Sequence, residues 1–283
     1  MKLGIVMEGG ASRTVFSCGV TDCFLEEELM PDYFVGVSAG IAYGVSYLSR
    51  QKERNLKIIM EYMPDKRYMG VRYLLDRNMK SFYNIPFVFG DVPNRLLPFD
   101  YGAFAAYEGE VEAVVTNIRT GRPEYLPVLR DDRSFETIVA SCALPVLFQP
   151  VRIGKRYYLD GGISDSVPYR RAWEKGCDKV IVILTRERDY VKKAEKAQLA
   201  VSALYHRYPK LVECLKRRAE VYNQSMKELY QAEREGRIFV LAPEDVFGTK
   251  RTESSPEKLR KLYEEGYAQA KKSMDAIRSY LNG

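Results

Sequence analysis

The chain has 283 residues, enough for a full hydrophobic core, and its composition, 46% hydrophobic and 29% charged, is typical of a globular protein. No stretch approaches the roughly 18 consecutive apolar residues of a membrane-spanning helix, and the first apolar run is too short for a signal peptide. We therefore expect a cytoplasmic protein. Five scattered cysteines and a single histidine argue against a disulfide framework and against a zinc site.

Strand and helix patterns alternate over the first 185 residues. Short apolar or β-branched runs predict strands, and longer runs of helical pattern predict helices between them. The strands are expected at 3–7, 33–35, 111–117, 156–159 and 179–184, and the helices at 15–29, 41–49, 135–142 and 168–175. This alternation predicts an α/β fold, with a mostly parallel sheet covered by helices on both faces.

The rest of the chain has a different character. Residues 191–235 are rich in Lys, Glu, Ala, Leu and Tyr, which predicts two long helices that break near 206–209. A strand at 237–241 and a final amphipathic helix at 256–281 follow. We therefore divide the chain into a catalytic core, residues 1–185, and a C-terminal basic helical extension, residues 186–283, with one strand that returns to the sheet.

The sharpest motif is Gly-Val-Ser-Ala-Gly at residues 36–40. It follows a predicted strand and precedes a predicted helix, which is the context that a nucleophile elbow requires. Gly36 and Gly40 allow a tight turn, so that Ser38 projects from the carboxyl end of a strand. The N-terminus of the following helix favours negative charge on a reacting oxygen. The alternative is a glycine-rich turn with a helix-capping serine.

A second motif, Glu-Gly-Gly-Ala-Ser-Arg at residues 8–13, also joins a strand to a helix. Small consecutive residues leave backbone N–H groups able to converge on an anion, so Gly9, Gly10 and Ala11 are candidates for an oxyanion hole. The segment lacks the glycine spacing of a dinucleotide-binding loop and the Gly-Lys-Ser/Thr of a P-loop. The alternative is an ordinary strand-to-helix loop.

A third motif, Tyr-Tyr-Leu-Asp-Gly-Gly at residues 157–162, puts Asp160 at a strand end, followed by Gly161 and Gly162. A carboxylate there can reach a neighbouring strand end, although a turn aspartate that caps backbone amides has the same pattern. A serine nucleophile needs a base, and the one histidine, His206, lies in a basic helical segment with no catalytic pattern. A Ser–Asp dyad is therefore favoured over a triad.

Together, in this order, the three motifs resemble those of the patatin-like phospholipase family. That family has an Asp-Gly-Gly-Gly-x-Arg-Gly loop, a Gly-x-Ser-x-Gly elbow and an Asp-Gly-Gly or Asp-Gly-Ala base motif. Residues 140–150 also resemble the stretch before its base, and the likeness covers residues 1–185. The resemblance implies Ser38 as nucleophile and Asp160 as base, the N–H groups of Gly9, Gly10 and Ala11 as oxyanion hole, and Arg13 as the loop arginine.

This loop departs from the family pattern at three positions. Glu8 replaces the aspartate, Ala11 the third glycine and Thr14 the last glycine. Ala11 still supplies an N–H group, but a positive φ at this position would strain an alanine. The departures put the efficiency of the oxyanion hole in question.

The function predicted from these motifs is hydrolysis of carboxylic esters of lipids through an acyl-enzyme, with no cofactor and no metal. The aromatic stretch 82–89 is a candidate wall or lid of the acyl site, or a core-covering loop. Two other interpretations stay open: a catalytically weak, lipid-binding regulatory protein, and a nucleic-acid-binding protein that uses the basic tail. We expect no nucleic-acid partner.

All of the net charge of +6 lies after residue 185. Residues 1–185 carry 23 cationic and 23 anionic side chains, whereas residues 186–283 carry 21 and 15. Cations interleaved with tyrosines suit peripheral contact with an anionic membrane surface, and a solvated helical face is the alternative. The cations and tyrosines of this hypothesis are Lys216, Arg217, Arg218, Tyr205, Tyr208, Tyr222 and Tyr230.

Overall fold

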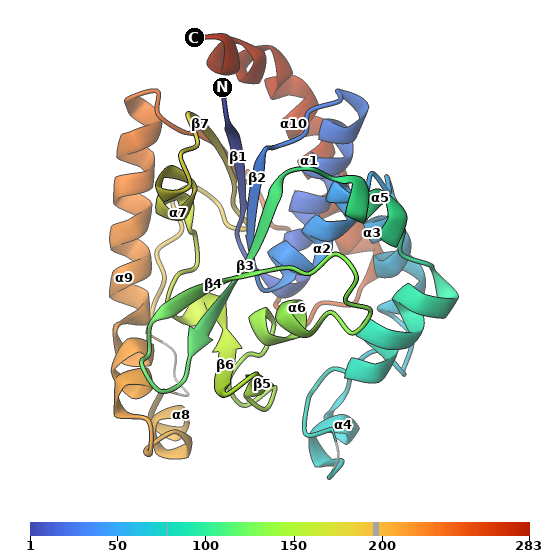
Figure 1. Ribbon diagram of the computed structural model, residues 1–283, viewed down its shortest axis with the longest axis vertical. Coiled ribbons are helices and arrows are strands. Elements are labelled where there is room, and N and C mark those ends of the chain that lie inside the picture. Colours follow the sequence, from blue (N-terminus) through green and yellow to red (C-terminus); the bar gives the residue numbers. More distant parts are fainter. Residues whose placement is uncertain (78, 195–197) are drawn as a thin grey trace.

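A mixed eight-stranded sheet forms the centre of the molecule (Figure 1). The computed structural model describes residues 1–77, 79–194 and 198–283. The strand order is β5-β6-β3-β2-β1-β7-β8, with β4 paired to β3 beside this path. The strands are β1 (Leu3–Met7), β2 (Tyr33–Val37), β3 (Glu110–Asn117), β4 (Pro123–Pro127), β5 (Val151–Ile153), β6 (Arg156–Asp160), β7 (Lys179–Ile183) and β8 (Phe239–Leu241).

Strands β3, β2, β1, β7 and β8 are parallel to one another, as expected when helices connect them. Strands β4 and β6 pair antiparallel with β3, and β5 pairs antiparallel with β6. The predicted α/β fold is confirmed, with a sheet that is mixed at the β3 side. Strands β4 and β5 were not predicted.

Helices cover both faces of the sheet, so its central strands are buried on both sides. Along β1, Ile5 and Met7 pack with the helices on one face, whereas Val6 between them packs with those on the other. One layer contains α1 (Val15–Glu26), α2 (Ala39–Leu48) and α10 (Pro256–Asn282), and the opposite layer contains α7 (Tyr169–Glu174) and α9 (Pro209–Arg234) (Figure 1).

Shorter helical segments lie mostly around the carboxyl edge of the sheet or connect the larger elements. They are η1 (Ala11–Thr14), α3 (Arg54–Lys57), η2 (Ile58–Tyr62), α4 (Val71–Leu75), η3 (Pro86–Leu96), α5 (Tyr101–Ala106), α6 (Glu136–Ser141), η4 (Gly161–Ile163) and α8 (Gln198–Leu204).

Two sequence expectations differ from the structure. No helix is expected from the sequence between residues 72 and 104, yet α4, η3 and α5 cover much of this stretch. The first of the two long helices expected at 191–235 is short: residues 191–194 are not helical, 195–197 lie outside the described residues, and α8 is followed by the turn near 206–209. The second, α9, is 26 residues long.

The region after residue 185 packs closely on the region before it. Strand β8 pairs with β7, and α10 lies along α1. The α10 hydroxyl of Tyr263 donates to Asp22 of α1 at 2.7 Å. The division into a core and an extension stays a prediction. In the structure, both regions contribute strands to one sheet and helices to the same layers.

Strand β3 aligns the two segments that carry the predicted nucleophile and base. Its register places Val37, the last residue of β2, opposite Val114, and Asp160, the last residue of β6, opposite Val115. A strand has only two hydrogen-bonding edges, and β4 occupies one of them over residues 112–116. Strands β2 and β6 therefore share the other edge and meet with their carboxyl ends facing each other.

Candidate active site

Ser38 occupies a strained turn between β2 and α2. Its φ of 55° and ψ of −127° lie outside the regions that side-chain-bearing residues normally adopt, as expected of a nucleophile elbow. The side chain of Ser141 holds this turn: its Oγ accepts the Ser38 N–H at 2.8 Å and donates to the Val114 carbonyl at 2.7 Å. Helix α2 begins at Ala39, so its first N–H groups lie next to the serine.

Asp160 is brought to Ser38 by the shared edge of β3, and both residues line one polar pocket. The residue is only 2% exposed. Its Oδ1 accepts the Gly162 N–H at 2.8 Å, whereas Oδ2 has no conventional hydrogen-bond partner among the described residues. One carboxylate oxygen is thus fixed in place, and the other is buried beside the serine.

Burial raises the pKa of Asp160 above its ordinary value. The nearby Ser38 hydroxyl, the Gly162 N–H and the positive charges of Arg218 and Arg251 act in the opposite direction and lower this pKa. The net upward shift suits a general base, because a higher pKa means a stronger base near neutral pH.

The predicted oxyanion loop lies against the serine elbow. A Cβ atom at Gly9 would approach the Val37 carbonyl oxygen to 2.5 Å and the Ser38 Cβ to 2.8 Å, so only glycine allows this contact. The N–H groups of Gly9, Gly10 and Ala11 donate no hydrogen bond among the described residues. Ala11 has a φ of 50°, which strains an alanine by about 1 kcal/mol.

Glu8 anchors this loop to two distant parts of the chain. Its Oε2 accepts hydrogen bonds from the Thr185 N–H at 2.7 Å and hydroxyl at 3.0 Å, and its Oε1 accepts the Tyr222 hydroxyl at 3.0 Å. Burial raises the pKa of Tyr222, and the Glu8 carboxylate raises it further, so the phenol stays protonated and donates. Thr185 and Tyr222 therefore position this loop. The sequence did not single out Thr185, and it singled out Tyr222 only as a candidate for membrane contact, whereas the side chain is buried against Glu8.

The other predicted supporting residues also surround the site. A Cβ at Gly161 would lie 2.2 Å from the Val114 carbonyl oxygen, so β6 can end against β3 only with glycine there. Gly36 and Gly40 flank the elbow, and Gly162 lines the polar pocket. Arg13 is buried within η1 and lines the same pocket.

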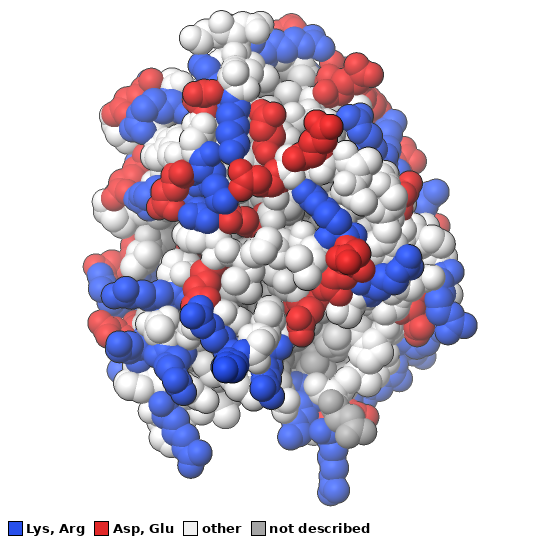
Figure 2. All heavy atoms as spheres, viewed as in Figure 1, with Lys and Arg blue, Asp and Glu red and all other residues white. Residues whose placement is uncertain are grey.

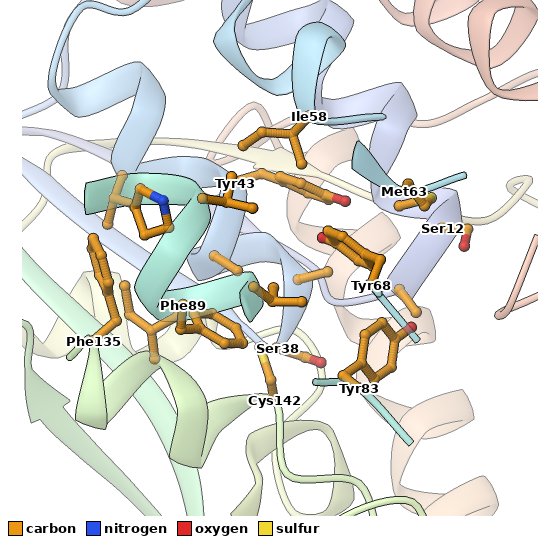
Figure 3. A pocket seen from close by; sticks show the side chains of 18 of the residues that line it. Ser12, Ser38, Tyr43, Ile58, Met63, Tyr68, Tyr83, Phe89, Phe135 and Cys142 are labelled. Atoms are coloured by element: carbon orange, nitrogen blue, oxygen red, sulfur yellow. The ribbon is translucent and has the colours of Figure 1, made fainter. Parts of the chain in front are cut away.

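An apolar cavity of about 110 Å³ opens on the other side of Ser38 (Figure 3). Cys142, whose thiol pKa is raised by burial, lies beside the serine. Tyr83 and Phe89, from the aromatic stretch singled out in the sequence, line the cavity with side chains from α2, η2 and the segments that connect the helices. These include Tyr43, Ile58, Met63, Tyr68, Phe99, Phe135 and Phe148.

His206 lies apart from this arrangement. It is exposed in the turn between α8 and α9, where its Nδ1 is 2.9 Å from the Ala203 carbonyl oxygen. It lines neither the polar pocket nor the apolar cavity. Among the described residues, no group of three or more His, Cys, Asp or Glu side chains is arranged to hold a metal ion.

One end of the surface combines cations with exposed apolar side chains. Figure 2 shows Lys and Arg side chains projecting at the lower end of the molecule, where α4 and α8 lie in Figure 1. Leu75 is 80% exposed on α4 and Leu204 61% exposed on α8. Lys216 and Arg217 lie on α9, whereas Arg218 turns inward and donates to the Gly162 carbonyl at 2.7 Å. No helix of the described residues could span a membrane.

A strained serine turn beside a buried carboxylate, at the edge of an α/β sheet, is the candidate site of a serine hydrolase. The sequence profile described as patatin-like phospholipase matches residues 5–173, and the chain belongs to this family. The resemblance predicted from the three motifs is thereby confirmed, and it supports lipid hydrolysis at the level of the family. A second profile, a domain of unknown function (DUF6363), matches residues 208–282.

Individual relatives add less about function. The chain is 26% identical over 201 residues to the uncharacterized protein YjjU of Escherichia coli (strain K12), covering 65% of this chain and 52% of YjjU. The chain thus spans about half the length of this relative. VipD from Legionella pneumophila aligns with 97% of this chain and 67% of its own, with a TM-score of 0.47 and 16% identity.

Proposed function

We propose that the chain is a serine acyl hydrolase that cleaves carboxylic ester bonds of lipids, with Ser38 as nucleophile and Asp160 as base. The observation that carries this proposal is the position of Ser38. Its side chain lies next to a buried carboxylate, to a loop whose N–H groups donate no hydrogen bond among the described residues, and to an apolar cavity. A nucleophile, a base, an anion site and an acyl site therefore lie within one small volume.

The proposed reaction has two displacements. Ser38 Oγ attacks the ester carbonyl carbon while its proton passes to Asp160 Oδ2, and N–H groups of Gly10 and Ala11 stabilise the negative oxygen. The intermediate collapses to an acyl-serine, and the leaving alcohol takes the proton from Asp160. Asp160 then takes a proton from water as the water attacks the acyl carbon. That proton returns to Ser38 Oγ as the carboxylic acid leaves.

The apolar cavity supports a lipid acyl group as the part of the substrate nearest the serine. Its volume of about 110 Å³ approaches the ~150 Å³ of a cavity that holds benzene. The first several carbons of an acyl chain therefore fit without rearrangement. A longer chain would need the helical segments around Tyr83 and Phe89 to move.

We also propose peripheral contact with an anionic membrane through the end of the molecule that carries α4 and α8. Exposed Leu75 and Leu204 can enter the interface, while neighbouring cations such as Lys216 and Arg217 attract anionic headgroups. Three residues of the hypothesis drawn from the sequence are left out of this surface, because Arg218 turns toward the site and Tyr205 and Tyr222 are buried.

The proposal is tested with a fluorophosphonate probe and a short p-nitrophenyl ester. The purified chain should be labelled covalently and should hydrolyse the ester, and Ser38→Ala should lose labelling and at least about 10³-fold of the activity. Ser254→Ala, at an exposed serine far along the chain, is the matched control and should behave as wild type. A folded wild type that is neither labelled nor active would favour the alternative of a lipid-binding regulatory protein.

A further inference from the structure

The wall of the apolar cavity contains a cation. Arg54, the first residue of α3, lines the cavity together with Ser38, and it is the one charged side chain among the described residues that form this wall. The residue is only 7% exposed, so little of it reaches water. Burying a charge without a charged partner is costly, and a cation is therefore an unexpected component of an apolar acyl site.

The hydrogen bonds of Arg54 all go to neutral groups. Its Nη2 donates to the Leu97 carbonyl at 2.8 Å, and its Nη1 lies 3.4 Å from the Ser46 Oγ. The Nε has no hydrogen-bond partner among the described residues, and the guanidinium lies 5.4 Å from the centre of the Phe99 ring. These contacts hold the side chain in place but do not balance its positive charge, and they leave a donor unused.

The charges around Arg54 do not include a carboxylate. Burial lowers the pKa of Arg54 to about 10, and the groups of the described residues that oppose this lowering are all tyrosines. Arg171 of α7 shows the more usual arrangement, because its Nε lies 2.8 Å from the Glu112 carboxylate. The surroundings of Arg54 therefore favour an anion that the described part of the chain does not supply.

Two tyrosine hydroxyls add donors to the same cavity. Figure 3 shows the side chains of Tyr43 and Tyr68 directed toward one another, on the side of the cavity away from Ser38. Burial raises the pKa of Tyr68, whereas a hydrogen bond with Tyr43 and the positive charge of Arg54 lower it. Burial also raises the pKa of Tyr43. Both phenols stay protonated near neutral pH and can donate to a negatively charged oxygen.

Helix α2 indicates how far this cation lies from the nucleophile. The cavity follows the helix from Ala39 to Val45. Ser46, which Arg54 contacts, comes seven residues after Ala39, so at roughly 1.5 Å per residue it lies about 10 Å further along the helix. An acyl chain bound at Ser38 therefore reaches Arg54 with its far end, after several carbons.

We infer that the apolar cavity accepts an acyl chain that ends in a carboxylate, with Arg54 as the partner of that carboxylate. The inference rests on the proposed function, which places the ester carbonyl at Ser38. The methylene groups then contact the apolar wall, and the terminal carboxylate accepts hydrogen bonds from the planar guanidinium, whose geometry suits a carboxylate. The preferred substrates are thus half esters of medium-chain dicarboxylic acids, because a simple fatty acyl chain would leave Arg54 without an anion.

The first test uses the wild type and two p-nitrophenyl esters of equal length. One is the mono-ester of suberic acid, and the other is that of suberamic acid, in which a neutral amide replaces the terminal carboxylate. The value of kcat/KM should be about tenfold higher for the suberate ester. The corresponding esters of succinic and succinamic acid should be hydrolysed alike, because their chain is too short to reach Arg54.

The second test changes the cation. In Arg54→Met, which keeps an unbranched side chain, the ratio of kcat/KM for the suberate ester to that for the suberamate ester should fall about tenfold. Arg54→Lys should keep part of the preference. Lys57→Gln, at an exposed cation on the same helix, is the control and should keep the wild-type ratio. An equal kcat/KM for the two esters in wild type, or an unchanged ratio in folded Arg54→Met, would overturn the inference. The wild-type comparison still decides if Arg54→Met does not fold.

Failure of the proposed function has a different signature. Calorimetry with monomethyl suberate and with octanoate measures binding to Ser38→Ala, which requires no turnover. Monomethyl suberate should bind, and its binding should weaken about tenfold when Arg54→Met is added. If this difference is found but wild type hydrolyses none of the esters, the assignment of Ser38 as nucleophile falls and the carboxylate site stands.

Two other calorimetric results would count against the inference. Undetectable binding of monomethyl suberate to folded Ser38→Ala would rule out the carboxylate site. Binding of octanoate that depends on Arg54, together with equal hydrolysis of the suberate and suberamate esters, would assign the cavity to free fatty acids. That result would overturn the assignment of the carboxylate to the substrate's acyl chain.

Discussion

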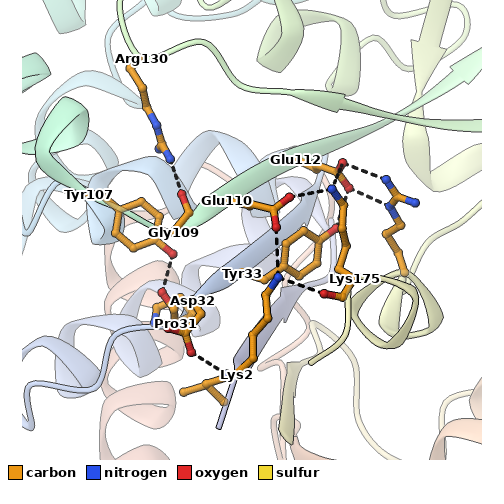
Figure 4. Close-up of polar contacts among 12 residues, drawn as sticks. Lys2, Pro31, Asp32, Tyr33, Tyr107, Gly109, Glu110, Glu112, Arg130 and Lys175 are labelled. Atoms are coloured by element: carbon orange, nitrogen blue, oxygen red, sulfur yellow. Dashed lines mark hydrogen bonds and ion pairs between the residues drawn. The ribbon is translucent and has the colours of Figure 1, made fainter. Parts of the chain in front are cut away.

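The two ends of the central sheet carry many charged side chains but arrange them differently. At the amino end, the carboxylates of Glu110 and Glu112 have cations directly beside them (Figure 4). Glu110 contacts Lys2 at 3.0 Å and Lys175 at 2.6 Å, and Glu112 accepts Arg171 Nε at 2.8 Å. At the carboxyl end, cations gather around a serine and outnumber the carboxylates that line the polar pocket.

The pKa values of the buried carboxylates at the two ends differ accordingly. At the amino end, burial alone would raise the pKa of Glu112, but Arg171, Tyr33 and Lys175 outweigh it and the net pKa is lowered. At the carboxyl end, burial dominates and the pKa of Asp160 is raised. The ionised form of Glu112 is therefore stabilised by the fold, whereas that of Asp160 is not.

The largest effect on activity is expected for Asp160, the carboxylate at the carboxyl end of the sheet. Asp160→Asn should reduce kcat/KM for a short p-nitrophenyl ester by about 10³-fold, because the general base is lost. Its melting temperature should not fall, since Asn keeps an acceptor for the Gly162 N–H and removes a buried charge. Asp165→Asn, at another carboxylate with a raised pKa, should leave activity within about twofold. Wild-type turnover by Asp160→Asn would refute the dyad.

At the amino end of the sheet, a substitution of Glu112 should lower stability and leave activity unchanged. Glu112→Gln should lower the free energy of unfolding in urea by about 3 kcal/mol, because Arg171 loses a buried partner. The folded variant should keep its ester hydrolysis. The folded-state pKa of Glu112 is depressed, so its stabilisation is present above the unfolded pKa of roughly 4.3 and is lost as pH falls further. The variant should therefore lose less of its free energy of unfolding than the wild type as the pH falls below this value. An equal decrease with pH in both proteins would contradict this account.

A smaller effect is expected on membrane contact. Lys216→Gln with Arg217→Gln should weaken binding to anionic vesicles by on the order of 2 kcal/mol, about 1 kcal/mol for each charge. The loss should shrink as salt rises. Lys261→Gln with Lys272→Gln removes the same charge from α10 and should change co-sedimentation little. Equal binding to anionic and zwitterionic vesicles would leave these cations as a solvated surface.

The smallest expected effect is a change in the pKa of Asp160 when a neighbouring cation is removed. Arg218 lowers the pKa of Asp160 by its positive charge. Arg218→Gln should therefore move the acid limb of the pH profile of kcat/KM to higher pH, since Asp160 then binds its proton more readily. Arg217→Gln, at the exposed neighbour that lies 3.8 Å from Glu220, is the control. An unmoved limb in Arg218→Gln would mean that another group sets the acid side of the profile.

Much of the fold was predictable because its strands and helices alternate with clear patterns. The positions of Ser38, Gly9 and Asp160 at strand ends followed from the same patterns. That Ser38 and Asp160 adjoin could not be derived from periodicity. It depends on β6, which pairs antiparallel with β3 on the same edge as β2, beyond the point where β2 ends. The neighbouring strands β4 and β5 are short and partly exposed and show little apolar alternation, so the sequence pattern does not reveal this part of the sheet.

The remainder of the site depends on contacts across long sequence separations. Tyr222 bonds Glu8 from 214 residues away, and the Arg251 carbonyl accepts the Ser12 hydroxyl from 239 residues away. No local pattern encodes such pairs. Ser141 had one available signal, because it lies in the stretch that resembles the family's segment before the base.

Strand β3 has a consequence for how this site can change during evolution. None of its side chains is proposed to react, yet its backbone determines how far apart the ends of β2 and β6 lie. One residue inserted between Val114 and Val115 would add about 3.3 Å to this spacing and would turn every later side chain of the strand to the opposite face. The apolar residues of β3 can therefore be exchanged for other apolar residues, whereas insertions or deletions between these two positions should be selected against.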